Sequence, residues 1–233
     1  MVNKKLIILA AGRGTRLKPY TDNMPKCLFN IGGKTTILNR IVNFFQKDFE
    51  ISIVAGFCHE KIRSLFSNTN IIINPFYSFT NSIASLWFAR HLLDGDEIVM
   101  MNSDIVFEKN IYDLIVSSNK KNFVMIDSSR SDEADYKVFT YNNKITMMDK
   151  SLVQCSGEYI GICKLSSGTL CSFKNKIEEM VESGQYDEWF ETALVNMIIS
   201  DSIDLEYIDV AGYKWTEIDS PNDFIFAKKI VAE

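Results

Sequence analysis

The sequence holds few of the residues that build metal clusters or disulfide frameworks. It has two histidines and five cysteines, and no two cysteines form a C-x-x-C pair. His59 and His91 have no second histidine or cysteine at the spacing of metal ligands. We therefore expect neither a zinc site nor structural disulfides. The odd number of cysteines favours a reducing cytoplasm as the setting.

Long apolar runs and an excess of basic residues are also missing. No hydrophobic segment approaches membrane-spanning length, and residues 1–5 lead into a short apolar run and a glycine turn rather than a secretory leader. The net charge of -5 argues against binding to nucleic acid or to an anionic membrane. A small anionic substrate is compatible with this charge, because it needs only a few well-placed cations.

The pattern of apolar residues predicts one α/β domain over residues 1–233, since a chain with 46% hydrophobic residues can build a single large core. Short apolar runs at 6–10, 51–55 and 71–73 are typical of buried strands. Helical apolar spacing separates them, most clearly at 37–45. This β-α-β-α-β order predicts right-handed crossovers and a doubly wound sheet.

The alternation of strands and helices breaks after the predicted strand at 123–126. Segments 136–141 and 144–148 flank Asn142-Asn143, which predicts a two-residue hairpin turn. Such an antiparallel excursion would form a lid over a pocket. Helical spacing returns later, at 170–182 and 189–199.

The loop after the first predicted strand has the composition of an anion-binding turn. Gly12 and Gly14 let the backbone approach a ligand and present N–H groups to it, and the cations Arg16 and Lys26 follow. A dinucleotide-binding turn would need a third glycine and an acidic residue at the end of the second strand, and both are missing. A P-loop would need a glycine where Leu28 stands.

A third reading fits this loop. The run Leu9-Ala10-Ala11-Gly12-x-Gly14-Thr15-Arg16-Leu17-x-Pro19, followed by Pro25-Lys26, resembles the signature of the sugar-phosphate nucleotidylyltransferase family. The family motif ends in Pro-Lys-Pro, and Cys27 replaces its last proline, which we interpret as a subgroup difference. The resemblance implies a Rossmann-like, mixed and mostly parallel sheet of the nucleotide-diphospho-sugar transferase type. It assigns nucleotide binding to Leu9, Ala10, Ala11, Gly12, Gly14 and Thr15.

The resemblance also implies a reaction and a metal. An acceptor phosphate oxygen attacks the α-phosphorus of a nucleoside triphosphate, with Arg16 stabilising the pyrophosphate and Lys26 bridging the α-phosphate and the attacking oxygen. Asp104, at the end of the predicted strand 97–101, and Asp219 match the Mg²⁺ ligands of the family, and Glu217 is placed beside the substrates. Without the resemblance, Asp104 would be interpreted as a turn or helix-cap residue. Asp219 or Ser220 would likewise be interpreted as the cap of the last helix, with Pro221 in its first turn.

Residues 80–87 allow two interpretations. Asn81 or Ser82 can cap the following helix while Ser85 faces a neighbour. Alternatively, Asn81, Ser82 and Ser85 contact the nucleotide, because an Asn side chain and a helix N-terminus can read a base or hold a phosphate. The segment is similar to one in the family branch that uses CTP, which includes phosphocholine and aminoethylphosphonate cytidylyltransferases, and this favours the second interpretation.

Two further segments are candidates for the acceptor site. Segments similar to residues 134–138 and 157–161 lie near the acceptor in that branch; the alternative is an edge hairpin. Tyr186, Asp187 and Trp189 combine aromatic rings with a carboxylate, which would suit an ammonium group, and the alternative is core packing. The predicted acceptor-site residues are Tyr136, Glu158, Tyr159, Tyr186, Asp187, Trp189 and Glu217.

The sequence thus predicts a Mg²⁺-dependent cytidylyltransferase that joins CTP to a small phosphorylated or phosphonylated amine, such as phosphocholine or 2-aminoethylphosphonate. Its product would serve the decoration of a cell-surface polysaccharide or lipid. The alternatives are a hexose-1-phosphate nucleotidylyltransferase using UTP, dTTP or CTP, and a nucleotide-sensing domain without activity. A homodimer is compatible with the sequence, which does not determine the oligomeric state.

Overall fold

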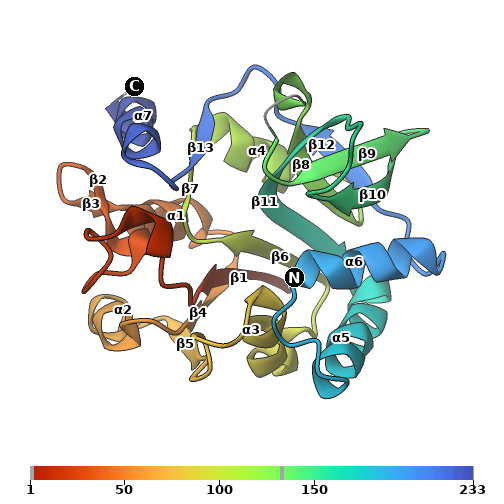
Figure 1. Cartoon of the computed structure of the whole chain (residues 1–233), viewed down its shortest axis with the longest axis horizontal. Coiled ribbons are helices and arrows are strands. Elements are labelled where there is room, and N and C mark those ends of the chain that lie inside the picture. Colours follow the sequence, from red (N-terminus) through yellow and green to blue (C-terminus); the bar gives the residue numbers. More distant parts are fainter. Residues whose placement is uncertain (1–2, 132–133, 233) are drawn as a thin grey trace.

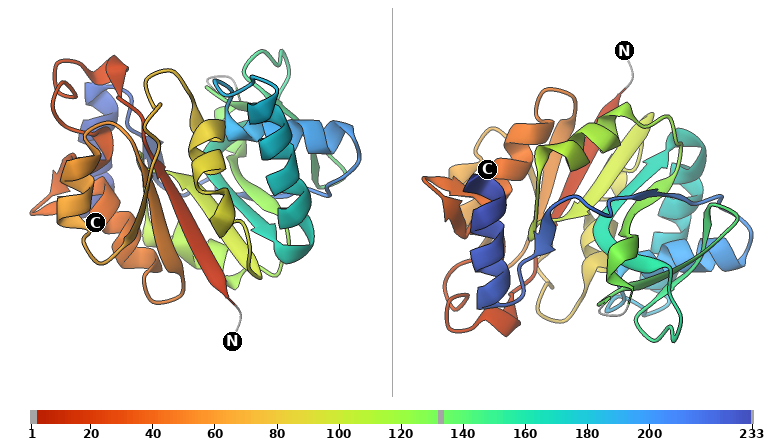
Figure 2. Two further views of the ribbon diagram at one scale, coloured as in Figure 1. Left: turned by 90° about the horizontal axis from the view of Figure 1, so that it is seen from below. Right: turned by 90° about the horizontal axis from the view of Figure 1, so that it is seen from above.

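The structure is a computed structural model that describes residues 3–131 and 134–232. A nine-stranded mixed sheet with the order β5-β4-β1-β6-β11-β8-β12-β10-β9 forms its centre (Figure 1). Helices cover both faces of this twisted sheet, as the two side views of Figure 2 show. No helix in the described ranges is long and apolar enough to cross a membrane.

The first half of the sheet is parallel, as the sequence predicts. β1 (Lys4–Ala10) lies between β4 (Glu50–Ala55) and β6 (Glu97–Asn102), and β5 (Asn70–Ile73) is the edge strand beside β4. The central residues of β1 are fully buried because helices cover both faces of the strand. This position explains the uninterrupted apolar run in the sequence.

Alternate residues of β1 belong to two hydrophobic cores, one on each face. Leu6 and Ile8 pack in the first core, and Ile7 and Leu9 pack in the second. The first core also takes side chains from α1 (Ile37–Phe45), α2 (His59–Leu65), α4 (Lys109–Ser117) and α7 (Pro221–Ala232). The second core takes them from α3 (Ser82–Phe88), α5 (Ser167–Glu182) and α6 (Phe190–Ile199).

The second half of the sheet contains more antiparallel pairing than a single hairpin. The ten-residue strand β11 (Gly157–Ser166) runs antiparallel between β6 and β8 (Phe123–Asp127), and β12 (Glu206–Asp209) is parallel to β8. β9 (Lys137–Tyr141) and β10 (Lys144–Asp149) form the predicted hairpin, whose turn residues have positive φ. Near its start, β11 pairs with β8 and β9 on its two sides, so this stretch is interior and not the edge hairpin considered above.

Two short strand pairs lie outside the nine-stranded sheet, and the first is the tight hairpin that Gly32-Gly33-Lys34 predicts. β2 (Asn30–Gly32) pairs with β3 (Thr35–Thr36) just before α1. β7 (Ile105–Phe107) pairs with β13 (Trp215–Glu217), so that Ile105 lies opposite Glu217. The backbone N–H of Ile218 extends this pairing by donating to the Asp104 carbonyl oxygen at 3.1 Å. The pairing therefore joins the loop after β6 to the loop before α7.

Candidate active site

A cavity of about 480 Å³ opens at the carboxyl ends of β1 and β6. Ligands of open α/β sheets bind beyond the carboxyl ends of the strands, so this is the expected location of a site. Most of the predicted site residues line the cavity, namely Leu9, Ala10, Ala11, Gly12, Gly14, Thr15, Arg16, Lys26, Asn81, Ser82, Ser85, Asp104, Tyr136, Glu158, Tyr159, Trp189, Glu217 and Asp219.

Tyr186 and Asp187 differ from the rest of the predicted set, because they do not line the cavity. They lie in the turn before α6, where Tyr186 is 47% exposed. The carbonyl oxygen of Tyr186 accepts a hydrogen bond from the Asn81 N–H at 3.1 Å, so this turn anchors the start of α3. Of the three neighbours predicted to form an ammonium pocket, the structure brings only Trp189 to the cavity, since closeness along a turn does not align side chains.

The glycine turn after β1 is built for close backbone approach. Gly14 has φ of 60°, in the left-handed region, and its carbonyl oxygen accepts a hydrogen bond from the Thr21 hydroxyl at 2.8 Å. The space beside Gly12 is open, with no atom within 4 Å of the position of a Cβ. At Gly56 a Cβ would lie 2.7 Å from the Ala11 carbonyl oxygen, so this glycine lets the loop after β4 support the turn.

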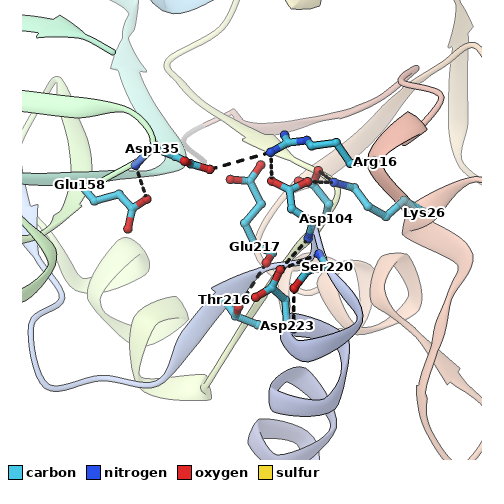
Figure 3. A network of polar contacts seen from close by, with 10 residues as sticks. Arg16, Lys26, Asp104, Asp135, Glu158, Thr216, Glu217, Ser220 and Asp223 are labelled. Atoms are coloured by element: carbon cyan, nitrogen blue, oxygen red, sulfur yellow. Dashed lines mark hydrogen bonds and ion pairs between the residues drawn. The ribbon is translucent and has the colours of Figure 1, made fainter. Parts of the chain in front are cut away.

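Four side chains form an ion-pair network at one end of the cavity. The Lys26 Nζ lies 2.7 Å from an oxygen of Asp104 and 2.7 Å from an oxygen of Asp219. Arg16 Nη1 lies 2.9 Å from the second oxygen of Asp219. Figure 3 shows Arg16 and Lys26 entering this network from one side, with Glu217 next to them. Both cations belong to one-turn 3₁₀ segments, residues 15–17 and 26–28.

The electrostatics of this network follow from burial and crowding of charge. Burial alone would lower the pKa of the Lys26 ammonium, but the adjacent carboxylates of Asp104 and Asp219 raise it above its usual value. Burial raises the pKa of the Glu217 carboxyl, and the negative charges of the same two aspartates raise it further. Lys26 is therefore a permanent cation, while Glu217 is held closer to its neutral form.

The helix cap of α7 leaves the Asp219 side chain available to the cavity. The Ser220 hydroxyl accepts from the Asp223 N–H at 3.3 Å, and the Asp223 carboxylate accepts from the N–H groups of Ser220 and Asp219 at 2.7 and 3.1 Å. This reciprocal arrangement is a capping box, with Pro221 at the first helical position. Ser220 thus caps the helix, and Asp219 pairs with the two cations.

The donor set fits a hard divalent cation. One Asp104 carboxylate oxygen is buried and has no hydrogen-bond partner, although Lys26 pairs with the other. Within residues 3–131 and 134–232, no group of three or more His, Cys, Asp or Glu side chains could hold a metal as a closed cage. Mg²⁺ suits such a site, because it is commonly held by one or two carboxylates together with waters and substrate phosphates.

The polar residues of the segment before and within α3 each have a structural partner as well as a place on the cavity wall. The Asn81 side chain caps α3 by accepting from the Ser82 N–H at 2.9 Å. The Ser82 hydroxyl accepts from the Phe190 N–H at 2.9 Å, which ties α3 to α6. The buried amide of Asn74, which sequence reasoning did not select, donates to the Ser85 hydroxyl at 3.1 Å. The segment is therefore a preorganised wall.

Another part of the cavity wall is aromatic and acidic. The Tyr136 ring lies 5.1 Å from the Trp189 ring and 6.0 Å from the Tyr159 ring. Glu191, in the first turn of α6, is 4% exposed, and burial raises the pKa of its carboxyl to about 7. The sequence showed Glu191 only as part of an acidic run. Its place three residues before the buried Leu194, on the apolar face of the helix, was the signal that could have singled it out.

Comparison with known proteins identifies the family. The nucleotidyl transferase family matches residues 5–147, which is more than half of the chain. The chain belongs to this family. Its fold is that of solved relatives: the phosphocholine cytidylyltransferase of Streptococcus pneumoniae superposes with a TM-score of 0.82 at 21% identity, covering 99% of this chain and 100% of the other.

The curated relatives of this chain include members of two groups. The bifunctional protein GlmU of Methanococcus aeolicus is 29% identical over 95% of this chain, but the chain spans only 53% of that relative. Two cytidylyltransferases match over almost their whole length. The choline-phosphate cytidylyltransferase of Streptococcus pneumoniae is 25% identical, over 94% of this chain and 95% of its own length. The CTP:phosphoglutamine cytidylyltransferase of Campylobacter jejuni is 21% identical, over 93% and 96%.

Proposed function

We propose that this nucleotidyltransferase transfers a cytidylyl group from CTP to the phosphate or phosphonate of a small amine, as with phosphocholine or 2-aminoethylphosphonate, and releases pyrophosphate. The observation that carries the proposal is that one cavity holds two kinds of groups. Arg16 and Lys26 meet Asp104 and Asp219 on its wall, and the part called the acceptor end below contains Tyr136, Tyr159, Trp189 and the buried Glu191. The full-length matches to two cytidylyltransferases support this choice of nucleotide and acceptor.

In the proposed reaction, an oxygen of the acceptor's phosphate attacks the α-phosphorus of CTP in line, and the bond to the leaving pyrophosphate breaks as the new bond forms. No covalent enzyme intermediate is needed. The amides of Gly12 and Gly14 hold the phosphates, Arg16 opposes the charge of the pyrophosphate, and Lys26 opposes charge at the α-phosphate. The remaining walls of the nucleotide site are Leu9, Ala10, Ala11, Thr15, Asn81, Ser82 and Ser85.

Asp104 and Asp219 would hold Mg²⁺, which supplies charge neutralisation for the phosphates when it is bound. In this step, two cationic side chains of the protein change their partners. Lys26 and Arg16 now pair with the two aspartates, and the phosphates of CTP are the stronger anionic partners for both. Transfer of these cations to the nucleotide frees the carboxylate oxygens for the metal.

The acceptor end selects an amine by its rings and its charge. An aromatic face such as that of Tyr136 attracts an ammonium group by about 0.5–2 kcal/mol, depending on how far it is desolvated. Glu191 provides a negative charge near this ring, and the field of this carboxylate contributes to the raised pKa of the Tyr136 phenol. In this proposal, Glu191 and not Asp187 provides the carboxylate that pairs with the acceptor's ammonium group.

The second candidate is a hexose-1-phosphate nucleotidylyltransferase. It is favoured by the GlmU matches and by a fold shared with a putative glucose-1-phosphate thymidylyltransferase of Bacillus anthracis, with a TM-score of 0.79 at 19% identity over 99% of this chain and 96% of the other. The aromatic and acidic lining of the acceptor end argues against it, since a neutral sugar would leave the Glu191 charge uncompensated.

Pyrophosphate release tests the proposal. The protein is incubated with Mg²⁺ and CTP, UTP or dTTP, each with phosphocholine, phosphoethanolamine, 2-aminoethylphosphonate or glucose 1-phosphate. We expect turnover with CTP and at least one amine, and its loss when EDTA removes the metal. Turnover restricted to glucose 1-phosphate, with any nucleotide, would instead support the hexose-phosphate alternative.

A further inference from the structure

Lysine 150 places a positive charge inside the acceptor end of the cavity. Its Nζ lies 3.8 Å from the centre of the Trp189 ring, and its side chain is part of the cavity wall. Lys150 stands in the turn that leads from β10 to β11. The Asp149 carboxylate accepts a hydrogen bond from the Ser151 N–H at 2.7 Å, and this bond fixes the backbone on both sides of the lysine.

This contact uses the ring that an acceptor's ammonium group would otherwise occupy. An aromatic face attracts one cation at close range, and a second ammonium on the same face would be repelled by the first. An acceptor that carries only an ammonium beside its phosphate therefore meets a like charge at Trp189. Among the carboxylates that line the cavity, which include Asp135 and Glu158, Glu191 on helix α6 is the one whose field acts on the Tyr136 ring beside Trp189.

Lys150 and Glu191 thus offer charges of opposite sign to one small ligand. Glu191 is buried among the rings of the wall, and Lys150 is exposed at the rim, so the negative charge lies deeper than the positive one. The other acidic groups that act on Tyr136 are Asp149 and Glu188, and both are exposed. A ligand bearing both an ammonium and a carboxylate can satisfy both charges of the cavity at once.

We propose that the acceptor is an amino-acid-like zwitterion: a phosphorylated or phosphonylated compound with an amino group for Glu191 and a carboxylate for Lys150. This proposal rests on the cytidylyl transfer proposed above and narrows its acceptor class. Lys150 is the specificity-determining residue. Its ammonium remains on Trp189 and binds the carboxylate, which makes the ring a support for the lysine and not for the substrate.

Two matched pairs of acceptors isolate the carboxylate. 2-Aminoethylphosphonate and 2-amino-3-phosphonopropionate differ only by this group, as do phosphoethanolamine and phosphoserine. For the wild-type protein with CTP and Mg²⁺, we expect kcat/KM to be about five- to tenfold higher for the carboxylate-bearing member of at least one pair, through a lower KM at similar kcat, because a lysine binds a carboxylate at a partly exposed site.

Substitution of the lysine shows whether it causes the preference. Lys150→Met should abolish the preference by raising KM for the carboxylate-bearing member, while Lys150→Arg should keep the preference. Lys144→Met is the matched control, since Lys144 begins the strand that leads into this turn but pairs with Asp204 outside the cavity. A folded Lys150→Met variant also retains turnover, which separates loss of preference from loss of structure.

The outcomes separate the two proposals. If the wild-type protein uses amines but prefers the carboxylate-free member of each pair, or if the preference survives in Lys150→Met, the assignment of Lys150 is wrong and the cytidylyl transfer stands. If no amine of either kind is a substrate while glucose 1-phosphate is, the proposed function itself is wrong, and the role of Lys150 is overturned with it.

Discussion

Replacing Glu191 by glutamine should stabilise the protein in a strongly pH-dependent manner. The carboxyl is 4% exposed, and burial raises its pKa from the ordinary 4.5 to about 7. A group whose pKa is raised on folding binds its proton more tightly in the folded state. Glu191 therefore imposes no penalty below pH 4.5, and stability falls as the pH rises through 7, because the buried carboxyl must ionise.

The size of the effect follows from the shift in pKa. Each unit is worth about 1.4 kcal/mol, so a rise from 4.5 to about 7 corresponds to about 3 kcal/mol at pH values well above 7. Glu191→Gln removes this penalty and retains a polar group of the same shape. For a chain of this size, the change in free energy corresponds to a rise in Tm of about 6–12 °C at pH 8.5. At pH 5 the variant and the wild type should melt within about 2 °C of each other.

Thermal unfolding followed by circular dichroism between pH 5 and 8.5 measures this difference. Glu188→Gln is the matched control, since Glu188 is exposed and lies just before the same helix. Its Tm should differ from that of the wild type by the same small amount at every pH. A Glu191→Gln variant whose Tm difference from the wild type does not grow with pH would refute the assignment of an ionisable, buried carboxyl at the acceptor end.

Three further predictions concern the other parts of the site. Lys26→Met should lower kcat about 10²- to 10³-fold in the pyrophosphate-release assay, as for the loss of one preorganised charge, and an unchanged kcat would contradict its role. Asp219→Asn should raise the Mg²⁺ concentration for half-maximal rate at least several-fold; an unaltered metal dependence would remove Asp219 from the metal site. Gly161→Ala should lower the free energy of unfolding by about 2–3 kcal/mol in urea titrations, because φ is 76° and a Cβ would lie 2.7 Å from Ile105 Cδ1. Gly168→Ala, where nothing lies within 4 Å, is its control and should be near neutral.

Local signals in the sequence were sufficient for the first half of the fold. The β1 run is apolar along its whole length because helices cover both faces, and a strand of this kind can be recognised without knowing its neighbours. The hairpin of β9 and β10 was predicted from Asn142-Asn143, whose positive φ values fit a two-residue turn. In these cases the residues that specify the structure are adjacent in the chain.

The strand pairings that assemble the site are harder to predict from local sequence patterns. β7 and β13 have three residues each, too few for any periodicity, and yet their pairing brings Asp104 and Asp219 to the same lysine. That meeting was expected only from resemblance to a family. The position of β11 between β6 and β8 depends on long-range partners and could not be derived from its own residues.

At the acceptor end, closeness in the sequence did not predict which side chains line the cavity. Tyr186, Asp187 and Trp189 are consecutive or nearly so, but a turn spreads their side chains and only Trp189 reaches the cavity. The charges that replace the expected aspartate come from different elements: Glu191 from α6 and Lys150 from the turn after β10. Because α6 belongs to the core that packs against β11, the position of Glu191 depends on the same antiparallel strand that contributes Glu158, Tyr159 and Gly161 to the cavity wall. Substitutions that shift β11, such as Gly161→Ala, should therefore raise the KM of CTP and of the acceptor together.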